Sequence, residues 1–96
     1  MLKRNNIYRL SLESLSLKDE LAEKSNIQVE FENHDEIFTI IESLKEKNPF
    51  GDKNQAVEFA IGIKLFTEVM IRNRQHPLFD DFFPQVQTFM KKIKNI

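Results

Sequence analysis

The stretch that decides the fold is IQVEFENHDEIFTII, residues 27–41, because the spacing of its apolar residues changes partway through. Ile27, Val29 and Phe31 alternate with polar residues, a period of two that is typical of a strand with one buried face. In the second half of the stretch apolar residues recur every three or four positions, as in an amphipathic helix. Asn33 stands between the two patterns, where its side chain can cap the helix. We therefore expect the chain to pass from a strand to a helix here.

A second alternating segment precedes this stretch. Tyr8, Leu10 and Leu12 are separated by single polar or charged residues. Two strands that each have one apolar face pair most simply as an antiparallel hairpin. The pattern predicts strands at about residues 7–15 and 26–32, joined by a polar connection.

The rest of the chain follows the helical period. We expect helices at about residues 34–47, 53–75 and 78–94, the last with a kink or break near Pro84, since proline disrupts a helix interior. Gly62, in the middle of the longest helix, costs about 1 kcal/mol relative to alanine and predicts close approach by a neighbouring element. The phenylalanines of the last segment keep one helical phase, which predicts that they are buried: Phe79, Phe82, Phe83 and Phe89.

These elements predict an α+β fold with the order ββααα. A chain of 96 residues is one domain by length, so we expect a single domain over residues 1–96. The helices are expected to pack on one face of the small two-stranded sheet.

Composition narrows the class of function. Fourteen basic and fifteen acidic side chains give a net charge of −1, whereas binding to nucleic acid favours a basic surplus. The absence of cysteine removes disulfides and thiolate chemistry. No apolar run approaches the ~20 residues that span a bilayer. We therefore expect a cytoplasmic protein that has no membrane partner, and nucleic acid is disfavoured as a partner.

The predicted architecture favours self-association. A two-stranded hairpin is marginal in water, and its edges invite pairing with another strand. Val57, Ile61 and Leu65 form a second apolar stripe along the longest helix. A homodimer could join two hairpins into a four-stranded sheet or bury this stripe, and binding to another protein would also cover these surfaces.

Two groups of polar residues are candidate binding sites. His34 precedes Asp35 and Glu36, an arrangement that suits either acid–base chemistry or capping of a helix N-terminus. Near the end of the longest helix, three cations or potential cations could bind an anion or could instead complement the helix dipole: Arg72, Arg74 and His76. Neither group has the spacing of a recognised metal motif, so no metal or cofactor is predicted.

The hypothesis that these patterns favour is a non-catalytic homodimer or protein-interaction module. These patterns favour a non-enzymatic role over an enzymatic one and leave both open. The first alternative is an enzyme that binds a small ligand or a metal with His34 and His76 in one cleft. The second is a weak nucleic-acid accessory protein that uses Arg72, Arg74 and the lysines of the C-terminal segment.

Three segments also resemble a family of uncharacterised bacterial proteins of roughly ninety residues. They are ENHDEIF (residues 32–38), EFAIGIKLFTEVMIRNRQHPLF (58–79) and FMKKIK (89–94). The family is a domain of unknown function. The resemblance implies a compact bacterial domain and assigns no catalytic or ligand-binding residue.

Overall fold

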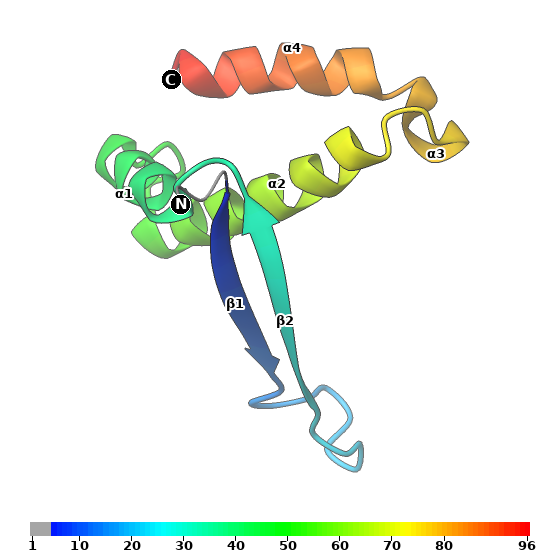
Figure 1. Ribbon diagram of the computed structural model, residues 1–96. Helices are drawn as coiled ribbons and strands as arrows, with labels where there is room; N and C mark the ends of the chain where they lie inside the picture. The colour runs from blue at the N-terminus through cyan, green and yellow to red at the C-terminus, as the bar shows by residue number, and fades with distance from the viewer. Residues whose placement is uncertain (1–4) are drawn as a thin grey trace. The chain divides into compact units, whose positions relative to one another are not determined.

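The computed structural model describes residues 5–96 and divides the chain into two compact units, residues 1–36 and residues 37–96. The first unit contains two strands, and the second contains four helices (Figure 1).

The first unit is an antiparallel hairpin of β1 (Asn6–Glu13) and β2 (Asn26–Asn33). The register runs without interruption from Asn6 opposite Asn33 to Glu13 opposite Asn26. It places three apolar pairs on one face of the ribbon: Tyr8 with Phe31, Leu10 with Val29, and Leu12 with Ile27. β1 ends at Glu13 rather than at residue 15, and a bond of 2.8 Å from the Ser14 amide to the Ser25 carbonyl closes the ladder.

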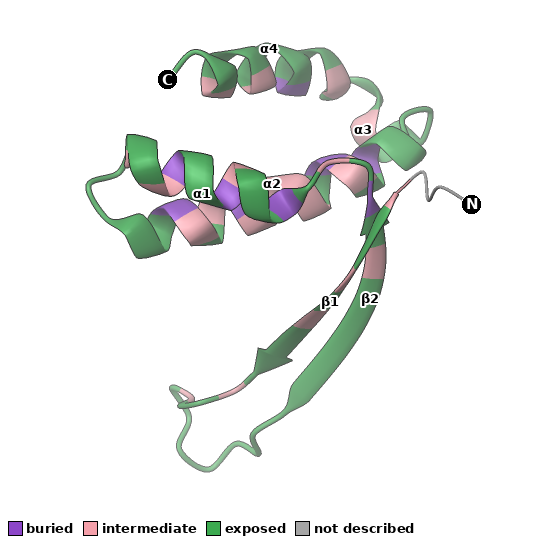
Figure 2. Ribbon diagram, turned by 60° about the vertical axis from the view of Figure 1, so that its left-hand side comes forward, coloured by how far each residue is buried: buried purple, intermediate pink, exposed green. Residues whose placement is uncertain are grey.

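The apolar face of the hairpin is unevenly covered. Tyr8 stacks on Phe31 with ring centroids 5.5 Å apart, and both residues are half-buried. Farther along the ribbon Val29, Ile27 and Leu12 are 45%, 62% and 69% exposed. Figure 2 shows most of both strands in the colour of exposed residues. The expected packing of helices on this face stays a prediction.

The second unit is built on a pair of helices, α1 (Ile37–Lys47) and α2 (Lys53–Arg72), which lie side by side (Figure 1). Its core contains Ile37, Ile41 and Leu44 from α1 and Ala56, Ala60 and Met70 from α2. Ala56 and Ala60 have no exposed surface, which is consistent with α1 lying close against α2 at these small residues. The turn between the helices uses Gly51 at a φ of +73°, a value that suits glycine.

The first helix begins at Ile37, three residues later than the sequence pattern predicts. The Asn33 side chain accepts a hydrogen bond of 2.9 Å from the Asp35 amide, which forms a tight turn ahead of the helix. The Asp35 carbonyl in turn accepts a bond from Asn6 of β1. The backbone of residues 33–35 is thus engaged with its own turn and with the hairpin, so that helical bonding starts only after Glu36.

The last predicted helix is two helices. α3 (Pro77–Asp80) is a single turn, and α4 (Phe83–Lys94) begins next to Pro84, which lies in its first turn. Proline is well tolerated there because the first amides of a helix have no intrahelical partner. α2 likewise ends earlier than predicted, at Arg72 rather than near residue 75. Directly after Arg72, the Asn73 amide donates a hydrogen bond to the Met70 carbonyl.

Ring contacts connect α2 to the segments around it. Phe59 lies 5.4 Å from Phe50 and 6.3 Å from Phe89 between ring centroids. Phe66 lies 6.3 Å from both Phe79 and Phe82. The predicted burial of the phenylalanine stripe is only partly correct, because Phe82 and Phe89 touch α2 and still remain 45% and 43% exposed. Val86 is the buried residue of α4.

The structure differs from the expectation that a neighbouring element lies close to Gly62. Within the described helical unit, a Cβ atom built on this residue would meet no atom within 4 Å, so none of the other helices approaches it closely. Gly62 is exposed, whereas the fully buried small residues of α2 are alanines.

The structure confirms the predicted fold class: an α+β chain in which two antiparallel strands precede the helices. Within residues 5–96, none of the helices combines the length and the apolar character that crossing a membrane requires.

Candidate functional site

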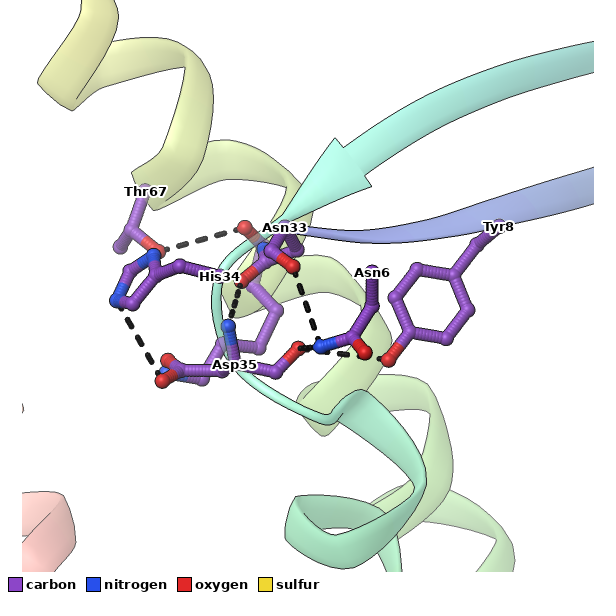
Figure 3. Close-up of polar contacts among 7 residues, drawn as sticks. Asn6, Tyr8, Asn33, His34, Asp35 and Thr67 are labelled. Carbon is purple, nitrogen blue, oxygen red and sulfur yellow. Dashed lines mark hydrogen bonds and ion pairs between the residues drawn. The ribbon is translucent and has the colours of Figure 1, made fainter. Parts of the chain in front are cut away.

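The junction between β2 and α1 collects the polar residues that the sequence singled out around His34 (Figure 3). Its centre is the Asp35 carbonyl, which accepts a hydrogen bond of 3.1 Å from the Asn6 side chain. The Tyr8 hydroxyl lies 3.4 Å from the same carbonyl and donates to the Glu36 carboxylate. These contacts tie the start of β1 to the segment that follows β2. The junction therefore has a clear structural role.

His34 lies at the edge of this junction. Its Nε2 is 3.4 Å from Oδ1 of Asp35, and its side chain is 62% exposed. When the imidazole is protonated the two groups form an ion pair that faces water on the histidine side. Across residues 5–96, no three side chains of the His, Cys, Asp and Glu types come together in a way that could hold a metal ion.

The second candidate group, at the end of α2, is occupied by local contacts with different partners. Arg72 donates from Nε to the Glu68 carbonyl at 3.4 Å. Arg74 places its guanidinium 5.5 Å from the centroid of the Phe83 ring, within range of a cation–π contact.

His76 caps the short helix α3. Its Nδ1 accepts a hydrogen bond of 3.1 Å from the Leu78 amide, as expected for a residue just before Pro77. His34 belongs to the first unit and His76 to the second, so the hypothesis that both line one cleft stays a prediction. Anion binding by Arg72, Arg74 and His76 also stays a prediction.

The apolar stripe on α2 is half-buried. Val57, Ile61 and Leu65 are each neither fully buried nor fully exposed. They remain candidate interface residues, but none of them is among the most exposed apolar side chains of the chain.

The more exposed surface is one that sequence reasoning did not single out. We call Leu12, Ile27 and Val29 the distal face of the hairpin. Leu12 and Ile27 also line an open hollow of about 290 Å³ together with Glu13, Ser14, Ser25 and Asn26. Beyond it, the connection between the strands carries Leu15 and Leu21, which are 75% and 94% exposed. The alternating pattern predicted an apolar face on each strand, but it carries no signal for which half of that face stays uncovered.

These features define the class: a small α+β protein with a hairpin unit, a helical unit and an exposed apolar strand face. The chain belongs to the family DUF3861, a domain of unknown function with a solved structure, whose model matches residues 6–95. This confirms the resemblance that the sequence indicated.

One solved structure extends this assignment to the fold. The chain is similar to a protein of unknown function from Pectobacterium atrosepticum, with 32% sequence identity and a TM-score of 0.83. The match covers 96% of this chain and 99% of that protein. No curated protein matches the sequence. The relatives therefore support the family and the fold and assign no activity.

Proposed function

We propose that this chain is a non-catalytic interaction protein that works as a homodimer, and that the hairpin, with its exposed distal face, forms the contact between the two copies. We also propose that the protein is bacterial and that it is located in the cytoplasm. The observation that supports it is the exposure of Leu12, Ile27 and Val29, which lie together on one face of a regular ribbon. Large apolar side chains gathered in this way mark a surface that another molecule covers.

A second copy of the chain is the occupant that the surface favours. Soluble oligomers are most often two-fold homodimers, in which the same patch serves both subunits. The distal face suits this arrangement because it is entirely apolar and needs no partner of complementary charge. The polar face of the ribbon is occupied within the hairpin, since Arg9 and Glu30 pair across the strands at 2.6 Å.

Apolar contact alone gives a dimer of marginal stability. Fully covering a Val, Leu or Ile side chain contributes about 1.5–3 kcal/mol. Covering the whole exposed part of six such side chains would therefore contribute at most roughly 6–9 kcal/mol. Association costs an estimated 4–15 kcal/mol, which is of the same order. A stable homodimer therefore needs a further contribution, and backbone hydrogen bonds of about 0.5–1.5 kcal/mol each can provide it.

The test is light scattering of the protein at micromolar concentration, with a double variant that places Lys at Leu12 and Ile27. We expect a dimer for the parent chain and a monomer with unchanged helical circular dichroism for L12K/I27K. The matched control is Leu21→Lys, which is 94% exposed and lies outside the distal face, and it should remain dimeric.

Two results would contradict the proposal. A strictly monomeric parent chain removes the homodimer altogether. A dimer that survives L12K/I27K but dissociates when Val57, Ile61 and Leu65 are changed to Glu moves the contact surface to α2.

A further inference from the structure

Both edges of the hairpin are open. The sheet has two strands, so that among residues 5–96 neither β1 nor β2 has a second neighbour. Natural edge strands are guarded by a proline, a bulge, a very short length or charged side chains. Here each strand has eight residues, neither contains proline, and the register has no bulge. Of these features the strands carry charged side chains, which on β2 are Glu30 and Glu32.

The register also shows which backbone groups face outward. The bond from the Ser14 amide to the Ser25 carbonyl makes that pair a hydrogen-bonded one. Such pairs alternate along an antiparallel ladder, so the pairs through Leu12, Leu10 and Tyr8 are of the same kind. The residues between them therefore direct their amides and carbonyls away from the partner strand. On β2 these are Asn26, Gln28, Glu30 and Glu32.

We propose that β2 pairs antiparallel with β2 of a second copy, about a two-fold axis that passes through Val29. The two hairpins then form one four-stranded sheet with the order β1, β2, β2, β1. This inference rests on the proposed homodimer and specifies its geometry.

Pairing about Val29 places apolar side chains of one copy opposite apolar side chains of the other. Val29 lies opposite Val29 of the second copy, and Ile27 lies opposite Phe31. The rows continue into β1, where Leu10, Leu12 and Tyr8 are the register partners of these residues. A β-branched side chain beside an aromatic one is a favourable cross-strand pair. Same-face side chains of neighbouring strands contact each other sideways, so this pairing covers the flanks of Val29, Ile27 and Phe31. The distal faces of the two hairpins then form one continuous apolar surface.

The polar face is compatible with the same register and disfavours a shift toward Phe31. Pairing about Val29 places Glu30 opposite Gln28 of the second copy and Glu32 opposite Asn26, so every carboxylate meets a neutral amide. A shift by one step of the pleat centres the axis on Glu30 and opposes two carboxylates directly, which is destabilising. The outward backbone groups of Gln28 and Glu30 meet as a hydrogen-bonded pair, as the alternation requires.

The edge of β1 is less suited to the same contact. An axis through Leu10 would place Ile7 opposite Glu13 of the second copy, and an axis through Arg9 would oppose two guanidinium groups. The centre of β2 also carries the better strand-forming residues, because Val and Ile favour strands more than Leu and Ser do.

Oxidative crosslinking tests the edge and the register together. The chain has no cysteine, so a single introduced cysteine can form only an intermolecular disulfide. Val29→Cys places two cysteines at a non-hydrogen-bonded pair about 4.5 Å apart between Cα atoms, within the range that a disulfide spans. Leu10→Cys is the matched control, because the two copies of Leu10 would be about 14 Å apart across three strand spacings.

A pair of proline variants tests the outward hydrogen bonds. Gln28 and Ser11 are register partners, and both direct their amides away from the hairpin, so proline at either position leaves the β1–β2 ladder intact. We expect Gln28→Pro to raise the dimer dissociation constant by about tenfold or more, because it removes an intermolecular bond in each half of the dimer. Ser11→Pro should change the constant by less than about twofold, because its amide faces solvent in the dimer.

The outcomes separate this inference from the proposed function. Crosslinking of Val29→Cys without crosslinking of Leu10→Cys supports pairing through β2. Crosslinking of Leu10→Cys alone, or dissociation by Ser11→Pro alone, places the contact on β1 and overturns the inference. A dimer in which neither variant crosslinks overturns the strand pairing and leaves the homodimer in place. A parent chain that is monomeric removes both.

Discussion

The helical unit and the hairpin are both amphipathic, but they differ in how far their apolar side chains are covered. Ile37, Leu44 and Met70 of the helical unit are at most 4% exposed, whereas Leu12 and Ile27 of the hairpin are more than 60% exposed. α1 and α2 shield each other because two helices already make two layers. A two-stranded ribbon is a single layer, so its own strands cannot cover its apolar face. The comparison shows that the helical unit has a buried core, whereas the apolar side chains of the hairpin are half-buried or exposed.

The largest expected effect comes from the same substitution made in both regions. Leu44→Ala should lower the free energy of unfolding by about 2–5 kcal/mol, because it opens a cavity between α1 and α2. Leu12→Ala should lower it by less than about 1 kcal/mol at concentrations where the chain is monomeric, because little buried surface is lost. Urea denaturation monitored by helical circular dichroism measures both changes.

Equal losses of stability for Leu44→Ala and Leu12→Ala in dilute solution would contradict the difference in coverage between the two units. That result would mean that the monomer itself covers the hairpin face.

Tyr8→Phe tests whether the hydrogen bond of the Tyr8 hydroxyl stabilises the contact between β1 and the segment that follows β2. The variant keeps the ring that stacks on Phe31 and removes the hydroxyl that donates to the Glu36 carboxylate. We expect a loss of about 1–2 kcal/mol, since hydrogen bonds to charged groups are among the stronger ones. Hydrogen exchange of the β1 amides should accelerate, while exchange in α2 should not. Equal protection of β1 in the parent and the variant would show that the hydroxyl is not an anchor.

Two glycines should respond in opposite directions. Gly62→Ala should stabilise the helical unit by about 0.8–1 kcal/mol, because alanine favours a helix and its Cβ atom meets no neighbour. Gly51→Ala should destabilise it by about 1 kcal/mol, because the φ of +73° is strained for any residue with a Cβ atom. Thermal unfolding of both variants measures the two signs. A loss of stability in Gly62→Ala would mean that α2 has a contact at this position in solution.

The smallest expected effect lies on the polar face of the hairpin. Arg9 and Glu30 pair across the strands with both side chains 62% exposed. Arg9→Gln should therefore cost less than about 1 kcal/mol, and the cost should shrink as salt is added. A larger loss that is independent of salt would show that this face is buried in the native assembly.

Much of the chain's local structure was predictable because it depends on spacing along the sequence. The alternation in Tyr8–Glu13 and in residues 26–32 identified both strands. The spacing of Ile37, Ile41 and Leu44 identified the first helix and its buried face. The break near Pro84 was also predictable, since proline disrupts a helix interior and α4 begins beside it.

The errors concern positions that are controlled by residues distant in the sequence. The first helix begins late because Asn6 and Tyr8 bond to the turn before it. The expectation for Gly62 was wrong within the helical unit, where the fully buried small residues of α2 are Ala56 and Ala60 instead. The candidate site near His34 was recognisable as a polar group, but its hydrogen bonds to β1 depend on the strand register. The exposed distal face had no signature in the sequence, since its residues alternate in the same way as the half-buried ones.

The sequence by itself determined the order of the elements, the apolar face of each strand and the buried stripe of each core helix. These properties depend on backbone geometry, which repeats every 2 residues in a strand and every 3.6 in a helix. Only the tertiary structure decided which of those apolar faces are covered. Coverage depends on which element lies opposite and how close it comes, and for Leu12, Ile27 and Val29 the two strands alone leave the face open.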